Sequence, residues 1–297
     1  MPVASLSARR HHLIAFFVLT YLISWAIEVP LALSYQGLVA IRPPFALHYL
    51  ASFGPLLAAV IVTLATEGFA GVARLFRGLI PPTPLIKGGS FPPLPPLTKG
   101  GRGDSLLYVL FALVSPLLLF ALIVAATALV RGSWPALRSL GWPDYLPEIG
   151  ILPTLGLWLL TFGLGEEVGW RGFALPRLQA QRSAFSASML LGVLWACWHL
   201  PALFYRDTYI AMGLLVIPML ATVAAVGSVV YTWLYNGTRG DLLLLILYHG
   251  LFDFLAVWDG GVIGPGMVMS IWMVFWAVRA YKAHGPATLS PGDKVVV

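Results

Sequence analysis

The chain has 297 residues, of which 59% are hydrophobic and only 10% are charged. A soluble domain carries about 25% charged residues, so this composition excludes a soluble globular protein and indicates one that crosses a membrane several times. The net charge of +6 does not indicate nucleic-acid binding, because the basic residues are scattered among loops and form no aromatic-interleaved patch. The single cysteine, Cys197, excludes an intrachain disulfide and a thiolate metal cluster.

Eight segments are long and apolar enough, or nearly so, to cross a bilayer as helices. A hydrocarbon core about 30 Å thick requires about 20 apolar residues of helix. Such continuously apolar runs lack the alternation of a barrel strand. The first run is longer than the apolar region of a signal peptide, so we interpret it as a retained span. The predicted fold class is all-α, a polytopic membrane protein with about eight transmembrane helices at residues 13–33, 47–66, 106–130, 149–175, 183–204, 210–235, 242–258 and 262–281.

The distribution of Lys and Arg predicts the orientation in the membrane. An even number of spans places both termini on one side, and the segments on that side hold 14 of the 18 Lys and Arg residues. The opposite side holds the other four, which are Arg42, Arg131, Arg138 and Arg206. Cytoplasmic loops carry the excess of basic residues, so both termini are expected to be cytoplasmic.

We predict that residues 1–297 form a single multi-pass membrane domain with one inserted linker. Residues 81–103 are rich in Pro and Gly, and the sequence PLIKGG at 84–89 recurs as PLTKGG at 96–101. A stretch of this composition buries too little apolar surface to offset its ordering entropy. We therefore expect a disordered cytoplasmic linker, with a proline-rich site for a partner protein as the alternative.

Three formal charges lie near the end of the segment at 149–175. Glu167 and Arg171 are four positions apart, on one helix face and in the favourable orientation, so we expect Arg171 to neutralise Glu167. Glu166 lies about 100° away around the helix and would remain a free carboxylate suited to general-base chemistry. Charge inside a bilayer is costly and marks function by default. A charge cluster at the helix end is the alternative.

Two further polar sets occupy apolar segments. His199 follows Trp195 by four positions, so the indole ring is expected to orient the imidazole, and a core histidine is the alternative. His249 and Asp253 have the same spacing and should project together. At about 1.5 Å per residue, His249, Glu166 and His199 lie about 10, 14 and 24 Å from the cytoplasmic ends of their segments. The depth of His199 is too large unless the polar serines at 183, 186 and 188 belong to the interface rather than to the span. With that assignment, we expect the three polar sets to form one active site in the cytoplasmic half of the membrane.

Motifs of other intramembrane proteases are absent from the sequence. It contains no H-E-x-x-H zinc helix, no G-x-S-G around a serine and no paired G-x-G-D aspartates. Two isolated acidic residues are interpreted as structural. Glu28 is expected to have an interfacial or protein partner, and Asp241 is expected to cap the N-terminus of the seventh span.

The order E-E-x-x-x-R, then an aromatic residue with x-x-x-H, then H-x-x-x-N/D resembles a known family. It is similar to the CPBP family, the CAAX proteases and bacteriocin-processing proteins, also called Abi proteins, which includes the Ras-converting CAAX prenyl endopeptidase. The resemblance covers residues 149–258, which we predict to be the catalytic core. The first motif is fairly specific, and the other two are specific only in combination.

The resemblance implies roles for seven residues. Glu166 would be the catalytic base on water, His199 its partner, and His249 and Asp253 would stabilise the oxyanion. Three residues would support the site, namely Glu167, Arg171 and Trp195. Trp195 stands where phenylalanine is usual in the family, and keeps a stacking ring. Asp253 stands where the eukaryotic enzymes have asparagine, and an ionised carboxylate only accepts hydrogen bonds. Asp253 could therefore act protonated, orient His249 or help to hold a metal.

The resemblance leaves two mechanisms open. Glu166, His199 and His249 could form a zinc site with two histidines, one carboxylate and an open position. Alternatively, Glu166 activates water without a metal, which is the scheme that we favour. A carboxylate bound to zinc would no longer be the free base.

The predicted function is hydrolysis of a peptide bond near a membrane-embedded or lipid-anchored C-terminus, by an intramembrane endopeptidase of a prokaryotic cell membrane. No nucleic-acid partner is expected, and the sequence does not predict the oligomeric state. A non-catalytic bacteriocin self-immunity factor or scaffold is one alternative. The other is a proton-coupled transporter that uses Glu166, His199 and Asp253 as a relay, although the sequence shows no matching halves.

Overall fold

The structure is a computed structural model that describes residues 6–80, 102–141 and 149–297. The regular elements of these residues are all helical, as predicted. The α-helices are α1 (Leu6–Tyr35), α2 (Leu47–Ala51), α3 (Gly54–Arg77), α4 (Arg102–Val109), α5 (Ser115–Arg131), α6 (Ile151–Trp158), α7 (Gly165–Glu167), α8 (Leu175–Gln179), α9 (Ala184–Trp198), α10 (Asp207–Met212), α11 (Val216–Gly237), α12 (Leu242–Ala256) and α13 (Pro265–Thr288). The π-helical segments are η1 (Leu110–Val114), η2 (Leu159–Leu164) and η3 (Val168–Ala174), and the 3-10 segments are η4 (Leu200–Phe204) and η5 (Gly213–Leu215).

Each of the eight predicted spans coincides with a helical run, which confirms a polytopic membrane fold. Among the described residues, six runs are long and apolar enough to cross a bilayer: Arg10–Tyr35, Leu47–Arg77, Leu106–Arg131, Ile151–Gln179, Ala184–Phe204 and Asp207–Gly237. The seventh, α12, is apolar but has only 15 residues. The eighth is α13, in which Gly285 interrupts the helical backbone. The predicted linker at 81–103 lies outside the described residues except for its last two, which begin α4.

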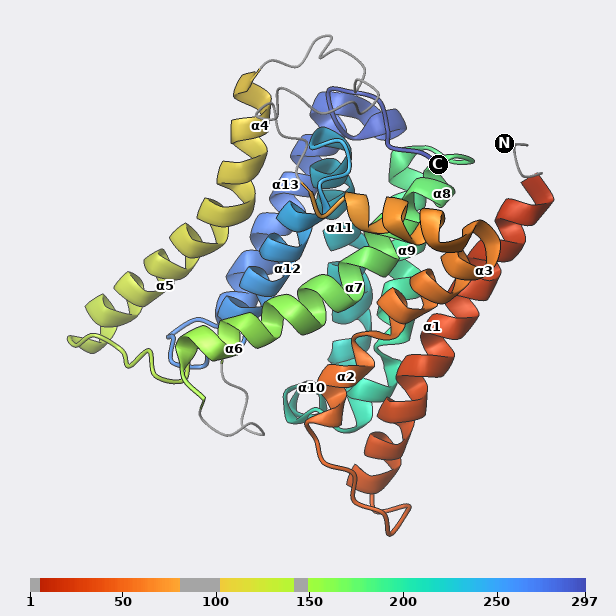
Figure 1. Cartoon of the computed structure of the whole chain (residues 1–297). Coiled ribbons are helices and arrows are strands. Elements are labelled where there is room, and N and C mark those ends of the chain that lie inside the picture. Colours follow the sequence, from red (N-terminus) through yellow and green to blue (C-terminus); the bar gives the residue numbers. More distant parts are fainter. Residues whose placement is uncertain (1–5, 81–101, 142–148) are drawn as a thin grey trace.

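The start of α1 and the end of the chain lie on the same side of the molecule (Figure 1), as an even number of crossings requires. That this side is cytoplasmic stays a prediction. The N-terminal helices pack together, since α1 contacts both α2 and α3. Within α3 the backbone leaves the helical region at Gly68 (φ 66°), so the last part of this helix takes a new direction.

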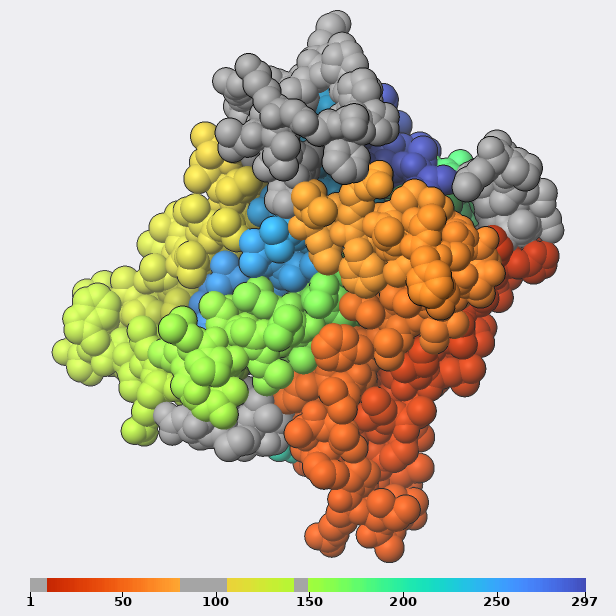
Figure 2. All heavy atoms as spheres, viewed as in Figure 1, coloured from red at the N-terminus to blue at the C-terminus, as the bar shows by residue number. Residues whose placement is uncertain are grey.

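The run from α6 to α8 positions the charged residues. It passes obliquely through the molecule (Figure 1), between α2 and α3 on one side and α12 on the other. Figure 2 shows residues of α2 and α3 in orange meeting this green run along one surface. The π-helical segments η2 and η3 flank α7, which contains the two glutamates. Such π-helical turns are rare and often lie at functional sites.

Glycines allow the neighbours of this run to approach closely. A Cβ atom added to Gly169 would lie 2.5 Å from backbone atoms of Pro55 at the start of α3. On the other side, a Cβ added to Gly163 would lie 2.7 Å from the carbonyl oxygen of Ile246 in α12. Without a strong hydrophobic force between helices in lipid, such small residues favour tight helix packing. The run is therefore held on two sides by backbone contact.

Substitution of Gly169 by alanine is expected to destabilise the fold. The added methyl group meets backbone of α3 that cannot rotate away, and such overpacking typically costs about 1–3 kcal/mol. The matched control is Gly156→Ala in α6, where a Cβ meets no atom within 4 Å. Thermal unfolding in detergent should show a lower Tm for Gly169→Ala only. Equal Tm values for both variants would contradict this packing.

Candidate active site

The structure brings all seven predicted site residues into one connected cluster. They come from α7 and η3, from α9 with the residue that follows it, and from α12. Each side chain contacts at least one other member through a hydrogen bond, an ion pair or a ring contact. The members are Glu166, Glu167, Arg171, Trp195, His199, His249 and Asp253. Segments that are up to 87 positions apart in sequence, at 166 and 253, thus form one site.

Glu167 is the fully buried centre of this cluster. Its Oε1 lies 2.7 Å from the Arg171 guanidinium and 2.8 Å from Nδ1 of His249. The predicted pairing of Glu167 with Arg171 is confirmed. Hydrogen bonds between charged groups are short and strong, and a buried carboxylate requires such partners. Glu167 therefore links η3 to α12 through its contacts with Arg171 and His249.

Glu166 has a different environment, although it is the neighbouring residue and is also buried. Its Oε2 accepts a hydrogen bond of 2.7 Å from the indole Nε1 of Trp195. Within the described part of the chain Glu166 forms no ion pair, in contrast to Glu167. The hydrogen bond occupies Oε2 and leaves Oε1 without a hydrogen-bond partner among the described residues. The two adjacent glutamates thus differ in their capacity to react, because the carboxylate of Glu167 is held by two charged or polar partners and that of Glu166 by one hydrogen bond.

The orientation of His199 is set by the backbone of α9. Its Nδ1 lies 2.8 Å from the carbonyl oxygen of Trp195, and the two rings are in edge contact with centroids 5.6 Å apart. A carbonyl oxygen only accepts, so Nδ1 carries the hydrogen and Nε2 of the neutral ring is an acceptor. The predicted contact between Trp195 and His199 is confirmed. His199 can therefore accept a proton or a hydrogen bond through Nε2.

His249 lies between two carboxylates. Its Nδ1 contacts Glu167, and its Nε2 lies 3.4 Å from Oδ2 of Asp253. A distance of 3.4 Å exceeds the usual 2.7–3.2 Å of a hydrogen bond, so the contact with Asp253 is weak. Asp253 is also the more open of the two partners, with 30% of its side chain exposed against none for Glu167. Nε2 of His249 can consequently transfer its hydrogen bond to another acceptor.

Two residues of α11 complete the site and were not predicted from the sequence. The Arg171 guanidinium lies 4.2 Å from the ring centroid of Tyr231 and donates a 3.2 Å hydrogen bond to Oγ of Ser228. The Tyr231 ring also contacts His249, with centroids 5.4 Å apart. Ser228 and Tyr231 are three positions apart and share a helix face. That spacing of two polar groups in an apolar helix is the signal that indicates them.

The side chains as they stand do not fit a zinc ion. A zinc site of Glu166, His199 and His249 requires all three to converge on one point at about 2.0–2.2 Å. Within residues 6–80, 102–141 and 149–297, no three His, Cys, Asp or Glu side chains are placed to hold a metal ion. Oε2 of Glu166 and both nitrogens of His249 already face protein partners.

A second polar cluster lies beside the site, around Glu28 of α1. The Tyr205 hydroxyl donates to Oε1 of Glu28 at 3.0 Å, and Nδ1 of His48 lies 3.5 Å from the same oxygen. The prediction that Glu28 has a protein partner is confirmed. The predicted cap is also confirmed, since Asp241 accepts a 2.9 Å hydrogen bond from the backbone N–H of Leu244.

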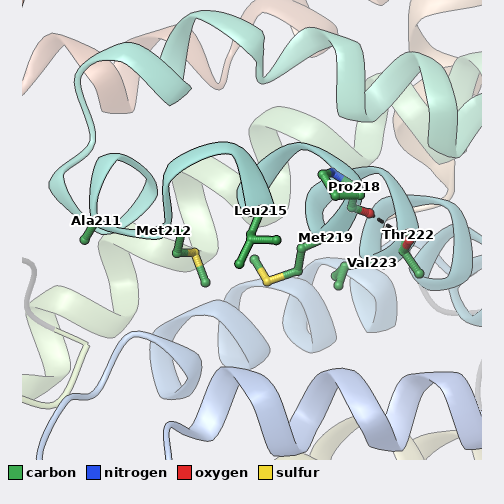
Figure 3. A pocket seen from close by; sticks show the side chains of 7 residues that line it. All are labelled: Ala211, Met212, Leu215, Pro218, Met219, Thr222 and Val223. Carbon is green, nitrogen blue, oxygen red and sulfur yellow. Dashed lines mark hydrogen bonds between the residues drawn. The ribbon is translucent and has the colours of Figure 1, made fainter.

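A hollow of about 690 Å³ lies apart from the seven residues, along α10, η5 and α11 (Figure 3). Its wall is almost entirely apolar, and the hydroxyl of Thr222 is satisfied by the carbonyl oxygen of Pro218 in the same helix. The lining residues are Ala211, Met212, Leu215, Pro218, Met219, Thr222 and Val223. This hollow offers no ionisable group for chemistry, in contrast to the polar cluster.

Comparison with known proteins identifies the segment that carries the cluster. Residues 148–255 match the family of type II CAAX prenyl endopeptidases, Rce1-like. The chain is also similar to CAAX prenyl protease 2 of Methanococcus maripaludis, with 32% identity over 122 residues, which is 37% of this chain and 40% of that protein. The chain thus spans less than half the length of this relative. The matching segment contains all seven site residues, and it is in this segment that the chain is similar to the Rce1-like CAAX prenyl endopeptidases.

Proposed function

We propose that this protein is an intramembrane endopeptidase in which Glu166 activates a water molecule. The observation that carries the proposal is that two adjacent buried glutamates have different bonding partners. Glu167 is bound to Arg171 and His249, whereas the one hydrogen bond of the Glu166 side chain among the described residues is that from the Trp195 indole. A general base must have a free oxygen within hydrogen-bond reach of water, and this arrangement supports Glu166 in that role.

The substrate that we propose is a peptide with a membrane-embedded or lipid-anchored C-terminus. The related protein of Methanococcus maripaludis is named a CAAX prenyl protease. The multi-pass fold and the apolar setting of the cluster support a substrate that reaches the site from the bilayer. Trp195, His199 and Asp253 are only partly buried, so the peptide would approach from their side.

The hydrolytic step follows from the hydrogen-bonding capacities of the three ionisable groups. Glu166 removes one proton from water while Nε2 of His199 accepts a hydrogen bond from the other hydrogen. The resulting hydroxide attacks the peptide carbonyl carbon, and the developing oxyanion receives a hydrogen bond from Nε2 of His249. Glu166 then gives its proton to the amine as the C–N bond breaks. Zinc at Glu166, His199 and His249 would instead supply a Lewis acid, and would remove Glu166 as the base.

Glu166→Gln is expected to reduce turnover of a CAAX-type peptide by about 10² to 10⁴-fold, because an amide cannot accept the proton from water. Turnover should be measured with purified protein in detergent or liposomes. The control is Glu67→Gln. Glu67 pairs with Arg74 and Arg177 at a partly exposed position, where ion pairs contribute only about 0–1 kcal/mol. Turnover by Glu67→Gln should remain near that of the wild type.

If Glu166→Gln cleaves as fast as the wild type, the assignment of the base is wrong. The non-catalytic and transport alternatives make a different prediction. They require that the wild-type protein shows no peptidase activity, and a transporter would show proton or solute flux in liposomes that depends on Glu166.

The metal-free scheme predicts that turnover survives dialysis against a chelator. Protein purified without added metal should then contain much less than one equivalent of zinc by elemental analysis. One bound equivalent, reversible inhibition by chelators, and joint loss of metal and activity in His199→Ala and His249→Ala would contradict this scheme.

Asp253→Asn separates two roles of this residue. If Nε2 of His249 stabilises the oxyanion, the variant should retain or gain turnover, because an amide adds a donor near the same position. A chelator-resistant enzyme that loses turnover in Asp253→Asn would show instead that the carboxylate acts on His249 by fixing its orientation.

A further inference from the structure

We propose that Trp195 is a positioning residue that aims the Glu166 carboxylate through its indole N–H. This inference rests on the proposed role of Glu166 as the base. The indole Nε1 donates to Oε2 of Glu166 at 2.7 Å, while the backbone carbonyl of the same residue accepts from Nδ1 of His199 at 2.8 Å. A single residue thus fixes both groups that we propose to bind the attacking water.

The Trp195 ring is itself held in place on several sides. It is in edge contact with the rings of His249 and Tyr231, at centroid distances of 5.5 and 6.0 Å. The Arg171 guanidinium lies 4.8 Å from its centroid, within the range of a cation–π contact. Arg171 is anchored in turn by the ion pair with Glu167. The buried ion pair therefore restrains the ring that restrains Glu166.

The chemistry of the indole group makes this restraint directional. Its nitrogen is a donor only and cannot exchange roles with the carboxylate. It engages Oε2, so the lone pairs of Oε1 remain available for the water that we propose. A phenyl ring in the same place would keep the edge contacts but lose the donor. The carboxylate would then be free to rotate about its last bond, and small displacements of a reacting group can reduce a rate by about 10²-fold.

The first test compares Trp195→Phe with Trp198→Phe. Trp198 lies three positions later and also packs against His199, but its Nε1 has no hydrogen-bond partner among the described residues. We expect Trp195→Phe to lower kcat by about 10 to 100-fold with little change in KM, because the bond aims the base and does not bind the peptide. Trp198→Phe should change kcat by less than about threefold. Equal kcat losses in the two variants, or a loss in KM alone, would overturn the inference.

The second test is independent of peptidase activity. Glu166→Met has a side chain of similar length without an acceptor oxygen. If the indole bonds to Glu166, the shift in Tm caused by Trp195→Phe should shrink in the Glu166→Met background, whereas the shift caused by Trp198→Phe should persist. Additive shifts for Trp195→Phe would overturn the inference. A wild-type protein without peptidase activity would instead overturn the proposed function. The comparison of Tm shifts in the two Glu166 backgrounds would still report whether the indole bonds to Glu166.

Discussion

The site depends on one buried ion pair, that between Glu167 and Arg171. Both side chains are fully excluded from solvent, so each would be strongly destabilising without the other. The carboxylate also binds His249 of α12, and the guanidinium contacts Trp195 and Ser228 on α9 and α11. Three transmembrane segments are therefore oriented by one charged pair. In an apolar environment no water molecule can replace either partner of the pair. The three segments are therefore held in one specific arrangement.

The packing of the helices determines where this ion pair lies. The oblique run from α6 to α8 is held by backbone contact at Gly163 and Gly169, and its two π-helical segments lie on either side of the glutamates. Arg171 belongs to η3, yet it still reaches Glu167 one turn earlier. The geometry keeps Glu167 directed into the protein while Glu166 faces Trp195. Adjacent residues thus acquire separate tasks, one structural and one available for chemistry.

Much of the fold was predictable, because bilayer thickness sets the length of apolar runs and all eight predicted runs are helical. The spacing of four positions also predicted the contacts of Glu167 with Arg171 and of Trp195 with His199. Local spacing could not predict contacts between helices. The bond between Glu167 and His249 and the role of Tyr231 depend on which faces of α7, α11 and α12 meet. The depths estimated from residue spacing were a weak guide to which polar residues meet. The α6–α8 run is oblique, so distance along this run does not equal depth in the membrane.

The central claim is that the charge of Glu167 stabilises the fold and the charge of Glu166 does not, and it is tested most directly by thermal unfolding of Glu166→Gln and Glu167→Gln side by side. Glu167→Gln leaves the Arg171 charge buried without a counter-ion, so the variant should lose about 3–5 kcal/mol of stability. Glu166→Gln can still accept the indole hydrogen bond through its amide oxygen, so its stability should equal or exceed that of the wild type. Equal losses in the two variants, or a larger loss in Glu166→Gln, would contradict the claim.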